Sequence, residues 1–205
     1  LKAHTRNRII PLTVRKPTAD EWIEWATMND IEAPVIVWVK NYPHCMNSYM
    51  EDKDNPYIYY PNKVQDAFVS GRSLERVSNI LKVRHMLDQD SLIAAMTGAV
   101  GEAASRDIQA FIAYQDQLPD WGTIIASPKT AMVPESPGAC AVLAYGAIAK
   151  VDKQSMGPFM DYIERFEPEW QAAFAINIAK SQTKQKIAFS CKAFSDWVAK
   201  NEDLL

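Results

Sequence analysis

Apolar residues recur at helical spacing along most of this 205-residue chain. Leu74, Val77, Ile80 and Leu81 share one stripe of a helix predicted over residues 73–84. The same type of pattern predicts further helices over residues 87–96, 102–115, 139–151, 156–165, 168–181 and 191–200. The chain is therefore expected to adopt a mostly α fold.

The first forty residues contain a predicted strand and two more helices. The β-branched run Ile9–Val14 predicts a short strand. Thr18 followed by Glu21 is the pattern of a capping box, which predicts a helix from there to about Asn29. The apolar run after Pro34 fits a buried strand, but a proline in a first helical turn and the short linker favour a helix.

Prolines divide the rest of the chain into segments. Residues 41–71 form a long connector with an acidic patch and an aromatic cluster, in which the run Val64–Phe68 could add a helical turn. Four more prolines follow between residues 119 and 137 and interrupt the helical pattern. These shifts predict a short N-terminal segment over 1–16, a helical domain over 17–116 and a helical C-terminal extension over 117–205.

Composition and charge exclude several classes of protein. Lys and Arg number 22 against 25 Asp and Glu, so the formal net charge is −3, which argues against a generally basic nucleic-acid binder. No apolar run approaches the ~18–20 residues that cross a bilayer, so no membrane partner is expected. Three widely spaced cysteines without a C-x-x-C pair indicate a reduced, cytoplasmic compartment.

Candidate chemistry is sparse. The chain has no G-x-x-x-x-G-K-[ST] phosphate loop, and its three histidines are not spaced for one metal ion, so no metal site is predicted. Arg6 and Arg8 directly precede the predicted strand, where the planar guanidinium suits phosphate oxygens. A solvated basic turn is the alternative for these two residues.

Arg72 is the second candidate. Gly71 permits a sharp bend and Ser73 or Ser70 can cap the following helix, so Arg72 would project at a helix N-terminus. The backbone N–H groups and the positive dipole end there favour an anion. Either a ligand phosphate or a nearby acidic side chain would offset the positive charge of Arg72.

The order of these segments resembles the second half of AAA+ ATPases, nearest to the MoxR-like and phage-associated branch. The segments are NRIIPLTV, PTADEWIEWA, a proline-rich connector and FVSGRSLERVSNIL, and the resemblance covers residues 1–85 and more loosely 86–116. In that family an arginine finger precedes the last core strand, and a sensor-2 arginine opens a helix of the lid. The resemblance implies that Arg8 is the finger, with Arg6 as the competing candidate, and that Arg72 is sensor 2.

The resemblance also implies a larger parent protein. Residues 1–16 would end a truncated α/β core, residues 17–116 would form the lid, and the P-loop core would lie upstream of Leu1. The parent would bind ATP and Mg²⁺ and form a homo-oligomeric ring that remodels a partner, whereas this chain alone would hold no cofactor and hydrolyse no ATP. A stand-alone helical interaction module without nucleotide chemistry is the alternative.

Overall fold

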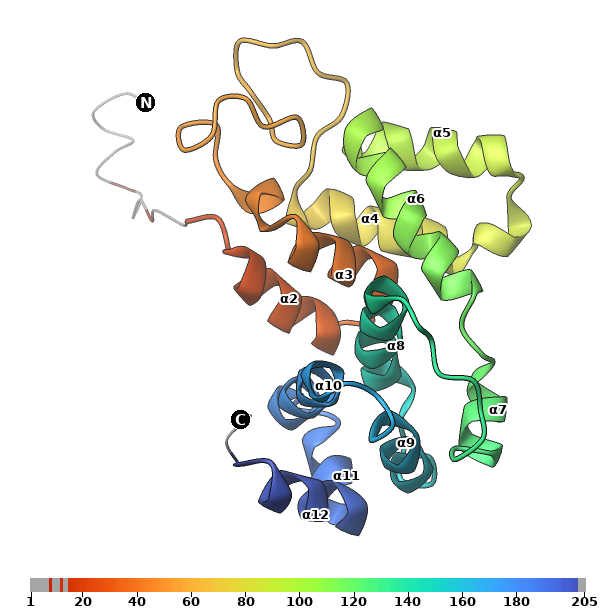
Figure 1. Ribbon diagram of the computed structural model, residues 1–205. Helices are drawn as coiled ribbons and strands as arrows, with labels where there is room; N and C mark the ends of the chain where they lie inside the picture. Colours follow the sequence, from red (N-terminus) through yellow and green to blue (C-terminus); the bar gives the residue numbers. More distant parts are fainter. Residues whose placement is uncertain (1–7, 9–11, 13–14, 203–205) are drawn as a thin grey trace.

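All regular structure in the described residues is helical. The computed structural model describes residues 8, 12 and 15–202, and no strand occurs among them. The α-helices in this part of the chain (Figure 1) are α2 (Ala19–Met28), α3 (Ala33–Asn41), α4 (Gly71–Lys82), α5 (Gln89–Val100), α6 (Glu102–Asp116), α7 (Trp121–Ala126), α8 (Pro137–Lys150), α9 (Met156–Ile163), α10 (Pro168–Lys180), α11 (Gln185–Ser190) and α12 (Lys192–Lys200). Two short 3-10 helices, η1 (Pro43–Met46) and η2 (Arg84–Met86), accompany them. The expected mostly α fold is confirmed.

The first two helices begin where the sequence predicts. Thr18 caps α2, and the carboxylate of Glu21 accepts a hydrogen bond of 2.9 Å from the Thr18 backbone N–H, which completes the capping box. The run after Pro34 is helix α3, so a buried strand there is wrong. Every residue from Ala33 to Val39 is buried, as expected for a helix that is apolar on all sides and lies in the core. The strand predicted over Ile9–Val14 falls outside the described residues except for Leu12, which is exposed.

Several boundaries differ from the expectation for local reasons. Helix α4 begins two residues early because Ser70 rather than Ser73 is its N-cap. Helix α5 begins at Gln89 because the Asp88 side chain accepts the Ser91 backbone N–H. The run Val64–Phe68 forms no helical turn. Instead, the Gln65 side chain accepts from the Tyr60 N–H and donates to the Ile58 carbonyl.

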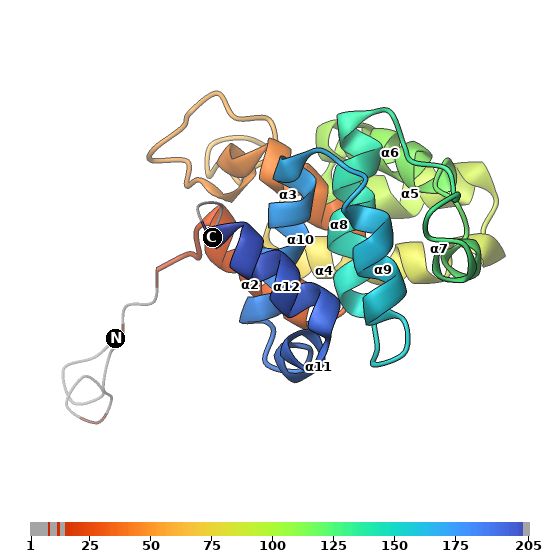
Figure 2. The same cartoon turned by 60° about the horizontal axis from the view of Figure 1, so that its bottom comes forward.

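Helix α8 lies at the centre of the molecule. It contacts α2, α3, α6 and α10, and in Figure 2 it lies among these helices near the middle of the molecule. Nine of its residues are buried: all of those from Ala139 to Tyr145, and also Ala147 and Ile148. One continuous core of buried apolar side chains runs from Ala19 in α2 to Trp197 in α12. The packing thus continues across residue 117, where the sequence changes composition.

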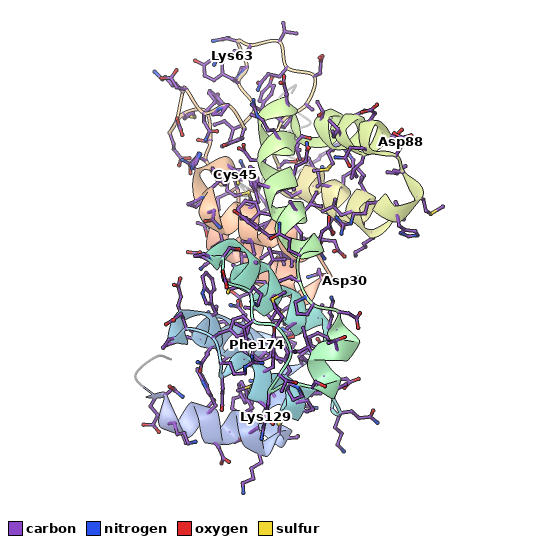
Figure 3. The ribbon with its side chains drawn as sticks, turned by 45° about the vertical axis from the view of Figure 1, so that its right-hand side comes forward. Asp30, Cys45, Lys63, Asp88, Lys129 and Phe174 are labelled. Atoms are coloured by element: carbon purple, nitrogen blue, oxygen red, sulfur yellow. The ribbon has the colours of Figure 1, made fainter. Side chains whose placement is uncertain are left out.

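The connector between η1 and α4 loops away from the helices at the top of Figure 1. Its middle is fixed to α6 by a hydrogen bond of 2.7 Å from the Tyr57 hydroxyl to an Asp107 carboxylate oxygen. Val69 donates its N–H to the Tyr57 carbonyl at 2.7 Å, which closes the loop just before α4. In Figure 3, Lys63 marks the part of the connector farthest from the body. These hydrogen bonds therefore hold the start of α4 in a defined position.

Within the described part of the chain, every helix is too short or too polar to cross a bilayer.

Candidate functional site

The start of α4 is held by a network of serine hydrogen bonds. Ser70 accepts the Ser73 N–H at 3.2 Å, and Ser73 accepts the Ser70 N–H at 2.8 Å. The Ser73 hydroxyl also lies 3.0 Å from the Phe68 carbonyl, to which it can donate. Because Ser73 is buried, these bonds fix the first turn of the helix relative to the end of the connector.

Arg72 is the second residue of this helix, and its side chain is exposed. On the opposite face of α4, Leu74, Val77 and Leu81 are buried and anchor the helix in the core. The ion pairs among the described residues join Arg15 to Glu21, Lys82 to Asp30 and Arg84 to Asp116. Arg72 takes part in none of them, so within this part of the chain no acidic side chain neutralises it.

The start of α4 carries a positive charge and no acidic side chain. Helix α2 carries Asp20 and Glu21 in its first turn, whereas α4 has no acidic residue there and carries Arg72 instead. The N-terminus of a helix bears a partial positive charge, so an arginine at that position is unfavourable until an anion is near. The arrangement of a capped helix end and an exposed guanidinium is suited to binding a phosphate group.

The two other candidate arginines are less well placed. Arg8 is exposed. Arg6 lies outside the described residues. The assignment of the arginine finger to either residue therefore stays a prediction.

A cleft that the sequence did not reveal lies between the two halves of the chain. It has a volume of about 440 Å³ and is lined by the loop before α3, the segment from Gln115 to Ile124, and α8. Asp30, at the level where the upper and lower helices meet in Figure 3, lines its edge and forms an ion pair of 2.8 Å with Lys82. Its size suits a small molecule. Its lining includes Glu32, Asp120 and Lys150. This combination of acidic and basic side chains does not indicate a particular ligand.

The connector exposes an apolar surface. We call this surface the connector patch, and its members are Tyr49, Met50, Tyr59, Val64 and Phe68. Tyr59 and Phe68 contact each other with ring centroids 5.1 Å apart. The sequence showed an aromatic cluster here but not its orientation, because Tyr57 of the same cluster is buried against α6.

The described residues give little support for a metal site or for a reactive thiol. No group of three His, Cys, Asp or Glu side chains there is arranged to hold a metal ion. Cys45 is fully buried, and burial raises the pKa of its thiol to about 12. A thiol with such a pKa is protonated at neutral pH and is not a nucleophile. Cys45 is therefore a core residue.

Comparison with protein-family models, with curated proteins and with solved structures finds no match to this chain.

Proposed function

We propose that this chain forms the helical lid of a AAA+ ATPase together with a C-terminal extension. In this proposal Arg72 contacts the phosphates of an ATP molecule that a P-loop core upstream of Leu1 binds with Mg²⁺. The observation that supports it most is the exposed guanidinium of Arg72 on the capped first turn of α4, which forms no ion pair with any other described residue. A sensor-2 arginine has to be positioned by the lid while remaining available to a ligand, and this arrangement meets both needs.

The remaining parts of the proposal follow from the resemblance. Arg8, or Arg6 in its place, would reach the γ-phosphate bound by a neighbouring subunit of a homo-oligomeric ring. The ring would remodel a partner in the cytoplasm. Phosphoryl transfer depends on positioning and on charge stabilisation, so these arginines would stabilise the transferred phosphoryl group rather than react with it.

The decisive experiment compares two arginines one helical turn apart. Arg72 and Arg76 are both exposed on α4, but only Arg72 lies in the first turn. In the protein that includes its upstream core, Arg72→Ala should lower the ATPase rate roughly ten- to a hundredfold, because charge-assisted contacts worth ~1.5–3 kcal/mol are lost. Arg76→Ala should leave the rate nearly unchanged.

Two results would contradict this proposal. The first is equal activity of the Arg72→Ala and Arg76→Ala proteins. The second is a gene in which no P-loop is encoded within the ~150–200 residues that precede Leu1, about one domain length. The 205-residue chain alone should show no magnesium-dependent ATP turnover, since the phosphate loop is missing from its sequence.

The connector patch favours a second candidate function, a helical interaction module without nucleotide chemistry. Five large apolar side chains are exposed there on a loop that hydrogen bonds hold in place. Such a surface is typical of a site that binds another protein. This alternative predicts that Arg72→Ala and Arg76→Ala behave alike in every assay.

A further inference from the structure

The connector patch is bordered by acidic side chains. Two of its apolar members stand out, since Met50 is 76% exposed and Val64 is fully exposed. Between residues 47 and 69 the chain carries four acidic residues and two lysines, which are Glu51, Asp52, Asp54, Asp66, Lys53 and Lys63. All of them except Asp52 are exposed, and the formal net charge of this segment is −2. A partner that covers this surface should therefore combine apolar and basic groups.

The last part of the chain carries the opposite charge. Between residues 180 and 202 there are five lysines and two acidic residues, which are Lys180, Lys184, Lys186, Lys192, Lys200, Asp196 and Glu202. All of these except Lys184 are exposed. The ion pairs among the described residues include none of them. This segment therefore has a formal net charge of +3, although the whole chain has a net charge of −3.

An exposed aromatic ring accompanies these lysines. Phe189 of α11 lies in the sequence between Lys186 and Lys192, and its side chain is 51% exposed. Its ring meets that of Phe194 in α12 edge to face, with centroids 5.4 Å apart. Because Phe194 is fully buried in the core, this contact holds Phe189 against the body of the molecule.

We call the exposed residues of this segment that are basic or aromatic the C-terminal basic surface. Its members are Lys180, Lys186, Phe189, Lys192 and Lys200. The surface combines positive charge with an apolar ring, and the connector patch combines negative charge with apolar side chains. The two surfaces are therefore complementary in charge and share an apolar component.

The two surfaces lie at opposite ends of the molecule. The connector forms the top of the molecule in Figure 1, and α11 and α12 form the bottom. In Figure 3, Lys63 marks the end that is far from the lower helices. One continuous core joins both ends into a single body. The two surfaces of one copy are therefore too far apart to meet, whereas those of two copies can.

We propose that the C-terminal basic surface of one copy of this chain binds the connector patch of a second copy. Phe189 would pack among the apolar side chains of the patch, and the lysines would lie beside Glu51, Asp54 and Asp66. Because the contact joins two different surfaces, a pair of copies still offers one free surface of each kind, and association continues into a chain or closes into a ring. This inference rests on the second candidate function, in which the connector patch binds a protein. It requires neither the upstream core nor ATP.

Analytical ultracentrifugation of the 205-residue chain tests this inference. The sedimentation coefficient should rise with protein concentration between about 10 μM and about 1 mM, the range in which weak protein contacts form. Sodium chloride should weaken the association roughly tenfold when its concentration is raised from ~0.1 M to ~1 M, because the screening length falls from ~10 Å to ~3 Å.

Two charge-changing variants identify the surfaces. Met50→Lys/Val64→Lys disables the connector patch, and Lys186→Glu/Lys192→Glu disables the C-terminal basic surface. All four residues are exposed, so both variants should fold. Each variant alone should stay monomeric. An equimolar mixture should form a one-to-one dimer and nothing larger, because the mixture contains one intact surface of each kind.

A third variant controls for the change in net charge. Arg76→Glu/Lys129→Glu carries the same change as Lys186→Glu/Lys192→Glu at two exposed positions outside both surfaces. This protein should associate as the unmodified chain does. Loss of its association would show that net charge alone governs the contact and would overturn the proposed pairing of surfaces.

Other outcomes also overturn the inference. A dimer of either defective variant alone would indicate a symmetric contact between like surfaces. A chain that stays monomeric at about 1 mM in ~0.1 M salt has no such contact, and binding of a DNA duplex or of anionic vesicles by that monomer would assign the basic surface to another partner. The ATPase comparison of Arg72→Ala with Arg76→Ala is a separate measurement, so the proposed lid function stands or fails independently.

Discussion

Glu21 is the residue whose protonation most directly affects the start of α2. Its carboxylate forms an ion pair with Arg15 and accepts the Thr18 backbone N–H. The hydrogen bond from Arg15, followed by the one from Thr18, lowers the pKa of Glu21 from 4.5 to about 2. Because the unfolded chain takes up this proton at a higher pH than the folded one, these contacts stabilise the fold above pH 4.5 and are lost as the pH falls toward 2.

Glu21→Gln should therefore reduce the acid sensitivity of the protein. Between pH 4.5 and 2, the free energy of unfolding should fall less steeply with pH in this variant than in the unmodified protein. Urea denaturation at several pH values measures the slope. Glu24→Gln is the control, since it removes the same charge from α2 without touching the cap. Equal slopes in all three proteins would show that the capping box does not contribute to acid stability.

At the scale of the elements, the turn between α5 and α6 depends on one glycine. Gly101 has φ 86° and ψ 164°, a region that is essentially restricted to glycine. A Cβ atom there would also lie 3.2 Å from the Ala67 carbonyl oxygen of the connector. This residue lets α6 begin directly after α5 ends and sets the connector against their junction.

Gly101→Ala should destabilise the protein by roughly 1–3 kcal/mol. Gly98 is the matched control: it lies in α5, a Cβ atom there meets no neighbour within 4 Å, and Gly98→Ala should stabilise the protein by about 0.5–1 kcal/mol. Urea denaturation of both variants measures the difference. A similar change in both, of the same sign, would mean that the backbone at residue 101 is not constrained as the structure indicates.

The sequence predicted those elements whose signal is local. The Thr18–Glu21 capping box marked the start of α2, and the stripe of Leu74, Val77 and Leu81 marked α4. Helices α7 and α11 were missed because six residues are too few to display a helical period. The position of Arg72 in the first turn of α4 could be predicted because its signal is also local, a cap followed by a cation. The close approach of the Trp22 indole to Gly71 could not be predicted, because the two residues meet only in the folded chain.

At the scale of the whole molecule, the continuous core determines how the two sequence segments behave. Ile148 is 1% exposed in α8, the helix that contacts α2, α3 and α6 as well as α10. The cleft of about 440 Å³ beside it could not be predicted, because its lining comes from three segments that meet only in the folded chain. The contacts of α8 lead us to expect that residues 17–116 and 117–202 unfold as one unit.

Ile148→Ala should test this cooperativity. Removal of a buried isoleucine side chain costs ~2–5 kcal/mol. Hydrogen exchange should show that the opening free energy of backbone amides falls by the same amount in α4 and in α10, although α4 lies in the other segment. Ser190→Ala, at an exposed position at the end of α11, serves as a surface control. A loss of protection confined to α8–α12 would indicate two independent folding units.

The anchored connector also has a consequence for limited proteolysis. Lys63 is exposed at its far end, while Tyr57 on one side is bound to Asp107 and Gln65 on the other bridges back to Ile58 and Tyr60. Trypsin should therefore cut after Lys63 without separating the two fragments, because the hydrogen bonds and the shared core hold the fragments together. The nicked protein should run as two bands on a denaturing gel and elute as one species in native size-exclusion chromatography. Separation of the fragments under native conditions would show that the connector joins the two parts of the molecule by its covalent chain alone.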